Sequence, residues 1–113
     1  MTRYLISFDD GSMDHIPAGD WESVGEAAHA VAREAKAAGA WIFGCGIERQ
    51  QAAIVGTDGT ITDGPVPETK AVIGGFSIID VPSRDEALQW AARIAAACRC
   101  AQEVREIMFD PES

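Results

Sequence analysis

Hydrophobic residues follow two different periods along this chain, and the change from one to the other separates the first two predicted elements. Residues 3–9 alternate aromatic or branched side chains with others, which is typical of a β-strand. Residues 21–38 place apolar side chains every three or four positions, which predicts an amphipathic helix. We expect the carboxylate of Asp20 to cap the start of this helix and Gly39 to end it.

The middle of the chain has strand composition broken by turn residues. Residues 41–47 and 52–56 are predicted strands, and Thr57-Asp58-Gly59-Thr60 has the composition of a hairpin tip. Residues 72–81 return to a strand, in which the pair Gly74-Gly75 indicates a bulge or a close approach of another group to the backbone.

The last third of the chain predicts a helix and a final strand. Ser83-Arg84-Asp85-Glu86 has the spacing of a capping box, so a second helix should begin here. A strand follows at about residues 103–109. The whole order is strand, helix, strand or hairpin, strand, helix, strand. That order predicts an α+β fold, a ferredoxin-like βαββαβ sandwich with an antiparallel sheet and two helices on one face.

The strand near residues 76–81 is apolar on both of its faces. Phe76 and Ile78 point to one face, and Ile79 and Val81 to the other. One layer of helices covers only one face of a sheet, so we expect the second face to be covered by another copy of the chain. The sequence therefore predicts a homodimer.

Length, charge and cysteine content narrow the function classes. The 113 residues fit one domain over 1–113, and eighteen acidic against nine basic residues give a net charge of -9, which disfavours nucleic acid and anionic membranes as partners. No apolar run is long enough to span a membrane, and the first residues resemble a strand rather than an export signal, so we expect a cytoplasmic protein with reduced cysteines. Cys98-Arg99-Cys100 is spaced too closely for a zinc site. No metal or cofactor is predicted.

Two segments carry a resemblance to a known family. Thr62-Asp63-Gly64-Pro65-Val66-Pro67-Glu68-Thr69-Lys70, followed by Ile73-Gly74-Gly75-Phe76, resembles the signature of the DGPF-type, YCII-related family, with valine at position 66 where the family name has phenylalanine. The resemblance continues through Asp85-Glu86-Ala87 to Glu103-Val104-Arg105. It implies a ferredoxin-like domain whose sheets pair face to face in a dimeric α/β barrel.

The same resemblance implies candidate chemistry. Some YCII-related proteins are associated with a His–Asp pair in a pocket, one of them a dehydrochlorinase of aromatic breakdown, and others occur beside sigma factors. Counting back from Gly39, the histidine of that group falls nearer Ala28 than His29 in this chain. Because one helical step turns a side chain by ~100°, this offset bears directly on whether His29 takes that role.

Candidate site residues come from the helix, the proline loop and the later strands. His29 is a candidate general base oriented by Asp63 or Asp80, and the alternative is a polar residue at the edge of a helix stripe. The candidates for ligand binding are Gly64, Pro65, Lys70, Gly74, Gly75 and Arg105. A turn, a bulge and an exposed ion pair explain these residues equally well.

The leading functional hypothesis is a small organic molecule bound in a pocket formed by the dimer, with acid–base turnover as its enzymatic version. In that version His29 abstracts a proton, Asp63 orients the imidazole, and Arg105 or Lys70 stabilises negative charge. The alternative is a non-catalytic dimeric interaction or regulatory module associated with sigma-factor signalling. A pocket filled by its own side chains, such as Trp90 and Phe76, would favour this alternative.

Overall fold

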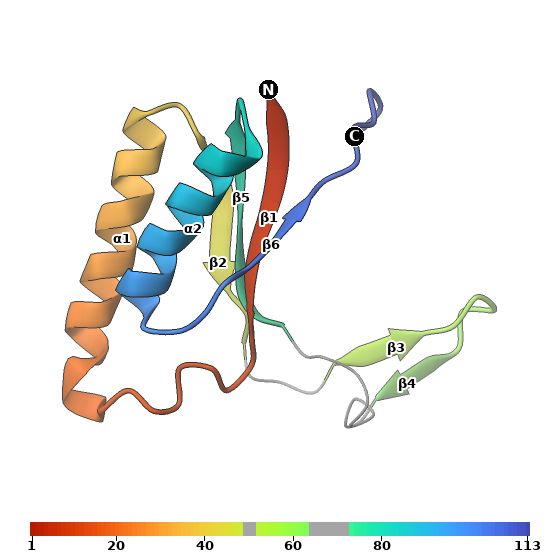
Figure 1. The fold of residues 1–113 in the computed structure, drawn as a ribbon. Helices are drawn as coiled ribbons and strands as arrows, with labels where there is room; N and C mark the ends of the chain where they lie inside the picture. The colour runs from red at the N-terminus through yellow and green to blue at the C-terminus, as the bar shows by residue number, and fades with distance from the viewer. Residues whose placement is uncertain (49–51, 64–72) are drawn as a thin grey trace.

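The computed structural model describes residues 1–48, 52–63 and 73–113 (Figure 1). It contains two α-helices, a four-stranded sheet and a separate hairpin. The elements are β1 (Thr2–Asp9), a 3₁₀ turn (Ala18–Asp20), α1 (Trp21–Ala37), β2 (Trp41–Gly46), β3 (Ala53–Val55), β4 (Ile61–Asp63), β5 (Ile73–Val81), α2 (Arg84–Cys98) and β6 (Glu103–Glu106).

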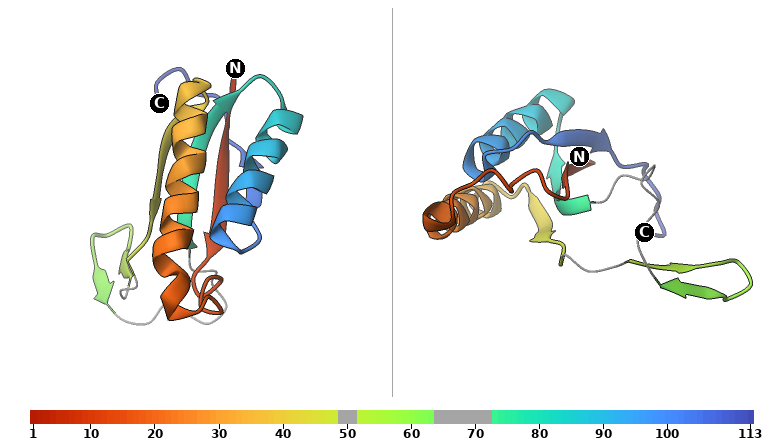
Figure 2. Two further views of the ribbon diagram at one scale, coloured as in Figure 1. Left: turned by 90° about the vertical axis from the view of Figure 1, so that its left-hand side faces the viewer. Right: turned by 90° about the horizontal axis from the view of Figure 1, so that it is seen from below.

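The four-stranded sheet has the order β2-β5-β1-β6, and each neighbouring pair is antiparallel. β5 lies between β1 and β2, so the first strand–helix–strand unit is split by a strand from the second. Both helices cover one face of the sheet (Figure 2). The ferredoxin-like α+β fold predicted from the element order is therefore confirmed. No helix in the described ranges is long and apolar enough to cross a membrane.

The core lies between the sheet and the helices. Ile6, Ile79 and Val81 are at most 2% exposed, and they pack against Ala87 and Ala91 of α2. Burying each large side chain stabilises the fold by roughly 1.5–3 kcal/mol. The small alanines let α2 approach the sheet closely, so the helix-covered face of the sheet is a continuous core.

Two of the predicted helix ends have the expected geometry. Gly39 adopts φ 73° after α1, and the N–H groups of Gly39 and Ala40 donate to the carbonyls of Lys36 and Ala35. This pair of hydrogen bonds is a Schellman motif, which requires a residue that tolerates positive φ. At the start of α2 the Ser83 hydroxyl accepts from the N–H of Glu86 at 3.2 Å, as the capping box predicted.

The β3–β4 hairpin forms a sheet of its own (Figure 1). Its tip has the predicted turn, in which Gly59 adopts φ 86° and the Asp58 carboxylate accepts from the N–H of Thr60. This bond lowers the pKa of Asp58. The hairpin stands away from the helices, on the other side of the main sheet (Figure 2).

The face of the main sheet that the helices leave uncovered carries a second apolar group. We call it the open face and define it by Leu5, Phe43, Phe76 and Ile78, which the strand register places on one side. The rings of Phe43 and Phe76 lie 6.1 Å apart, and Phe43 is 53% exposed. The apolar character expected on both faces of β5 is thus present.

Candidate functional site

A cavity of about 290 Å³ lies between the two helices and the sheet. Its apolar walls are formed by Phe8, Met13, Ala28, Val31, Ala32, Trp41 and Ile94, with Gly44 and Gly46 of β2 completing one side. Phe76 and Cys45 also border the cavity, although the strand register places both on the open face. Its remaining polar groups come from His29, Ser77, Cys98 and Gln102. No Asp, Glu, Lys or Arg lines the cavity within the described part of the chain, so the site suits a ligand without a full charge.

Two glycines allow the aromatic rings of Trp41 and Phe8 to pack directly against the strands. A Cβ on Gly44 would lie 2.6 Å from the Trp41 ring, and a Cβ on Gly75 would lie 2.6 Å from the Phe8 ring. Contacts this short do not occur between real atoms, so glycine is needed at both positions for the rings to lie against the sheet. The sheet sequence thereby supplies two aromatic surfaces to the cavity.

The two thiols at the end of α2, Cys98 and Cys100, both have a raised pKa. Burial raises the pKa of Cys98, and the neighbouring Cys100 raises it further. Burial also raises the pKa of Cys100, while a hydrogen bond from the Gln102 amide lowers it in part. A nucleophilic cysteine needs a thiolate, so Cys98 serves the cavity as a neutral, weakly polar wall.

His29 supplies the one side chain among the described lining residues whose residue type exchanges protons near neutral pH. It lies on α1 with its side chain exposed, so it borders both the cavity and solvent. Ala28 lines the cavity as well. The one-residue offset from the histidine of related proteins therefore leaves His29 in contact with the cavity.

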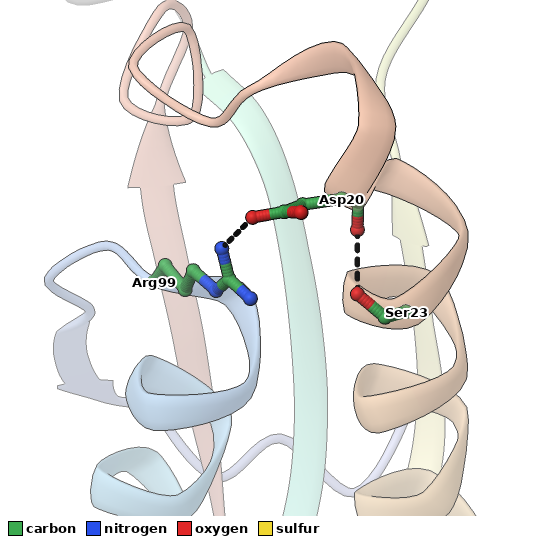
Figure 3. Close-up of polar contacts among 3 residues, drawn as sticks. All are labelled: Asp20, Ser23 and Arg99. Atoms are coloured by element: carbon green, nitrogen blue, oxygen red, sulfur yellow. Dashed lines mark hydrogen bonds and ion pairs between the residues drawn. The ribbon is translucent and has the colours of Figure 1, made fainter.

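An ion pair joins the start of α1 to the end of α2 at Arg99, the residue that follows Cys98 of the cavity lining (Figure 3). Nη1 of Arg99 donates to the Asp20 carboxylate at 2.8 Å, and the Ser23 hydroxyl donates to the Asp20 carbonyl at 2.9 Å. The expected capping by the Asp20 carboxylate is wrong, although α1 does begin at Trp21. Asp20 closes a 3₁₀ turn in an αR conformation rather than the extended one usual for a cap, and its carboxylate is turned to Arg99.

The hairpin carries one predicted catalytic residue away from the other. Asp63 is exposed at the end of β4, whereas His29 is on α1 on the far side of the main sheet (Figure 1). The protomer therefore does not bring the predicted His–Asp pair together. Gly64, Pro65 and Lys70 lie outside the described residues.

The other predicted ligand residues lie on the main sheet, outside the cavity lining. The ladder shifts register at Gly74, since Phe8 faces Gly75 while Asp9 faces Ile73. Both predicted reasons for the glycine pair, a bulge and a close approach, are present. The approaching group is the Phe8 ring at Gly75 and the Asp9 backbone carbonyl at Gly74. Arg105 faces Leu5, on the side opposite His29, and pairs with Glu103 at 2.5 Å.

Several cavity residues were not among the predicted site residues. Trp41, Ser77 and Gln102 carry no sequence motif, and Cys98 was considered for a zinc site, which its spacing from Cys100 disfavours. Ser77 did leave a signal, because it is a polar residue between apolar ones on the inward side of a strand. Gln102, in the connection after α2, left none.

Comparisons with known proteins bear on the family and the fold. The YCII-related domain matches residues 14–109, whereas no protein of curated function matches. Among solved structures, the chain is similar to 5-chloro-2-hydroxyhydroquinone dehydrochlorinase (TftG) from Burkholderia phenoliruptrix AC1100, in complex with 2,5-dihydroxybenzoquinone. The TM-score is 0.55 at 19% identity, over 99% of this chain and 98% of that one, which supports the fold. The narrower DGPF assignment stays a prediction. The chain belongs to the YCII-related family.

Proposed function

We propose that this protein binds a small, uncharged organic molecule of about one ring in the cavity between its helices and its sheet. The observation that carries the proposal is a cavity of about 290 Å³ with aromatic walls and no ionised side chain among its described lining residues. Ligand pockets of ~300 Å³ and more are typically apolar with a few polar groups. His29, Ser77 and Gln102 supply such groups here.

The acid–base version of this function assigns one step to His29. Its imidazole takes a proton from the bound molecule at the cavity edge and returns it to the product or to water. The neutral Cys98 thiol and the Gln102 amide border the same space and are available to orient the ligand. The dehydrochlorinase with the same fold, solved with a quinone, supports a ring compound as the ligand class.

The proposal also includes a homodimer. The open face exposes an apolar group that neither described helix of the same protomer covers, and pairing two such faces would give a dimeric α/β barrel. In that assembly the cavity of each protomer lies on the outer side of its sheet, away from the paired faces. This departs from a pocket enclosed between the two sheets.

The non-catalytic module is less well supported as an alternative. That role would be favoured by a cavity filled by its own aromatic side chains. Trp90 does not line the cavity but lies beneath the guanidinium of Arg93, 4.5 Å from the ring centroid. Phe76 borders the cavity, but its register places it on the open face.

Titration with hydroquinone, followed by the indole N–H signals in ¹⁵N–¹H spectra, tests the binding proposal. We expect the Trp41 signal to shift. Ala28→Leu should weaken binding at least about tenfold, because the larger side chain occupies the cavity. The matched control is Ala37→Leu, at an exposed position of the same helix. A Trp41 signal that does not move, or equal binding by both variants, would overturn the proposal.

The acid–base step is tested by incubating the protein with 5-chloro-2-hydroxyhydroquinone and measuring released chloride. We expect release by the wild-type chain and its loss in His29→Ala. Release that persists without the imidazole eliminates His29 as the acid–base group. Absence of release from the wild-type chain, with hydroquinone still bound, restricts the function to binding.

A further inference from the structure

The hairpin exposes apolar side chains that its own protomer does not cover. Val55 and Ile61 face each other across β3 and β4, and they are 65% and 66% exposed. Ile54 points to the other face of the hairpin and is 40% exposed. A three-residue strand pair of this kind is marginally stable in water by itself. The Val55–Ile61 pair therefore needs a surface to pack on.

The protomer as a whole exposes more surface than a compact chain of its size. Its accessible area is 7797 Å², whereas a compact monomer of 12.0 kDa should expose roughly 6,000 Å². Its radius of gyration is 15.8 Å, against about 13 Å for a compact domain of this length. The excess area of about 1,800 Å² exceeds the ~800 Å² that each partner buries in a standard interface.

Two exposed parts of the chain lie on the same side of the sheet. The hairpin and the segment after β6 both lie on the side away from the helices (Figure 1, Figure 2). The segment after β6 adds Met108 and Phe109, which are 89% and 90% exposed. The open face, the hairpin and this segment therefore face the same way.

We propose that the β3–β4 hairpin is a dimerisation arm, which packs its Val55–Ile61 pair against a second copy of the chain beside that copy's open face. The occupant is a second copy because the arm and the uncovered face belong to one side of one protomer. A twofold axis then places each arm on the other protomer and leaves neither arm exposed. This inference rests on the homodimer in the proposed function and adds the element that packs against the partner.

A double substitution with a control on the same hairpin tests the arm. Val55→Thr with Ile61→Thr keeps strand propensity but adds hydroxyls to the proposed contact face. Ile54→Thr makes the same kind of change on the opposite face. Sedimentation equilibrium of the full chain over a range of concentrations gives the dimer dissociation constant. We expect the double variant to raise it by roughly a hundredfold, since each change occurs twice in a symmetric dimer, and Ile54→Thr by less than about threefold.

The outcomes separate the arm from the dimer itself. A dimer whose dissociation constant is equal in the wild-type chain and the double variant overturns the arm and leaves the paired sheets intact. An equal effect of both hairpin faces also overturns it. A wild-type chain that stays monomeric at all concentrations overturns both the arm and the homodimer, and a hairpin folded back on its own protomer would give that result. None of these outcomes bears on whether hydroquinone binds in the cavity, which is tested separately.

Discussion

The two faces of the main sheet carry similar apolar residues but have different surroundings. On the helix-covered face Ile79 is fully buried under α2, whereas on the open face its neighbour Ile78 is only half-buried. The chain thus contains two potential cores, of which one is completed within the protomer. The composition of β5 alone, apolar on both sides, therefore already carries information about assembly.

The same division separates the candidate functions. The cavity with His29 lies on the helix-covered side, between α1, α2 and the sheet. The hairpin and the segment after β6 lie on the other side, and both carry exposed apolar residues (Figure 2). Ligand binding and assembly are thereby assigned to opposite sides of one sheet, and each can be changed without the other.

The largest expected difference is in the free energy of unfolding, between alanine substitutions at the neighbouring isoleucines of β5. We expect Ile79→Ala to lower the free energy of unfolding by about 2–5 kcal/mol, because it leaves a hole in a core that cannot collapse fully. Ile78→Ala should cost about 1 kcal/mol in dilute solution, because its side chain already meets solvent. Urea denaturation measures both values.

Protein concentration is the control for this pair. If the open face is covered in a dimer, the cost of Ile78→Ala grows as the concentration rises, while the cost of Ile79→Ala changes little. Equal costs at low concentration would show that the two faces are equally buried and would contradict the comparison.

Alanine substitutions at two glycines on neighbouring strands should differ less in their cost to stability. We expect Gly75→Ala to cost roughly 1–3 kcal/mol, because its new methyl group meets the Phe8 ring on the helix-covered side. Gly46→Ala should stay within about 0.5 kcal/mol, because no atom lies within 4 Å of its Cβ position. Thermal unfolding measures both, and a Gly46→Ala variant as unstable as Gly75→Ala would show that backbone conformation, rather than the ring contact, sets the cost.

Much of the fold could be predicted from the sequence because its signals are local. The cap at Ser83 and the positive φ at Gly39 mark helix ends through contacts within a few residues, and both are present. The Asp20 cap was wrong because its carboxylate bonds a residue 79 positions away. Local patterns do not contain partners that only the folded chain brings together.

The candidate site was predictable only in part for the same reason. His29 was identified by residue type and does line the cavity. The rest of the lining comes from five separate segments, and residues such as Gln102 meet the cavity only after α2 has packed on the sheet. The pairing of His29 with Asp63 was inferred from a family resemblance, and in the protomer the hairpin places Asp63 elsewhere.

Thiol alkylation offers the mildest test of the difference between the two faces. Cys45 is exposed and faces Phe76 of the open face across the ladder, while Cys98 is buried beside the cavity. Burial raises the pKa of Cys98 from its ordinary 9.0, so at any given pH the folded chain holds less thiolate there than the unfolded chain does. We expect iodoacetamide at neutral pH to modify Cys45 several-fold faster, with the rate at Cys98 rising only as the pH becomes alkaline. Peptide mass spectrometry after timed quenching measures both rates, and Cys45→Ser should remove the fast phase.

Slower labelling of Cys45 at higher protein concentration would indicate that a partner covers the open face. Equal labelling rates for Cys45 and Cys98 would mean that the helix-covered side is as accessible as the open one.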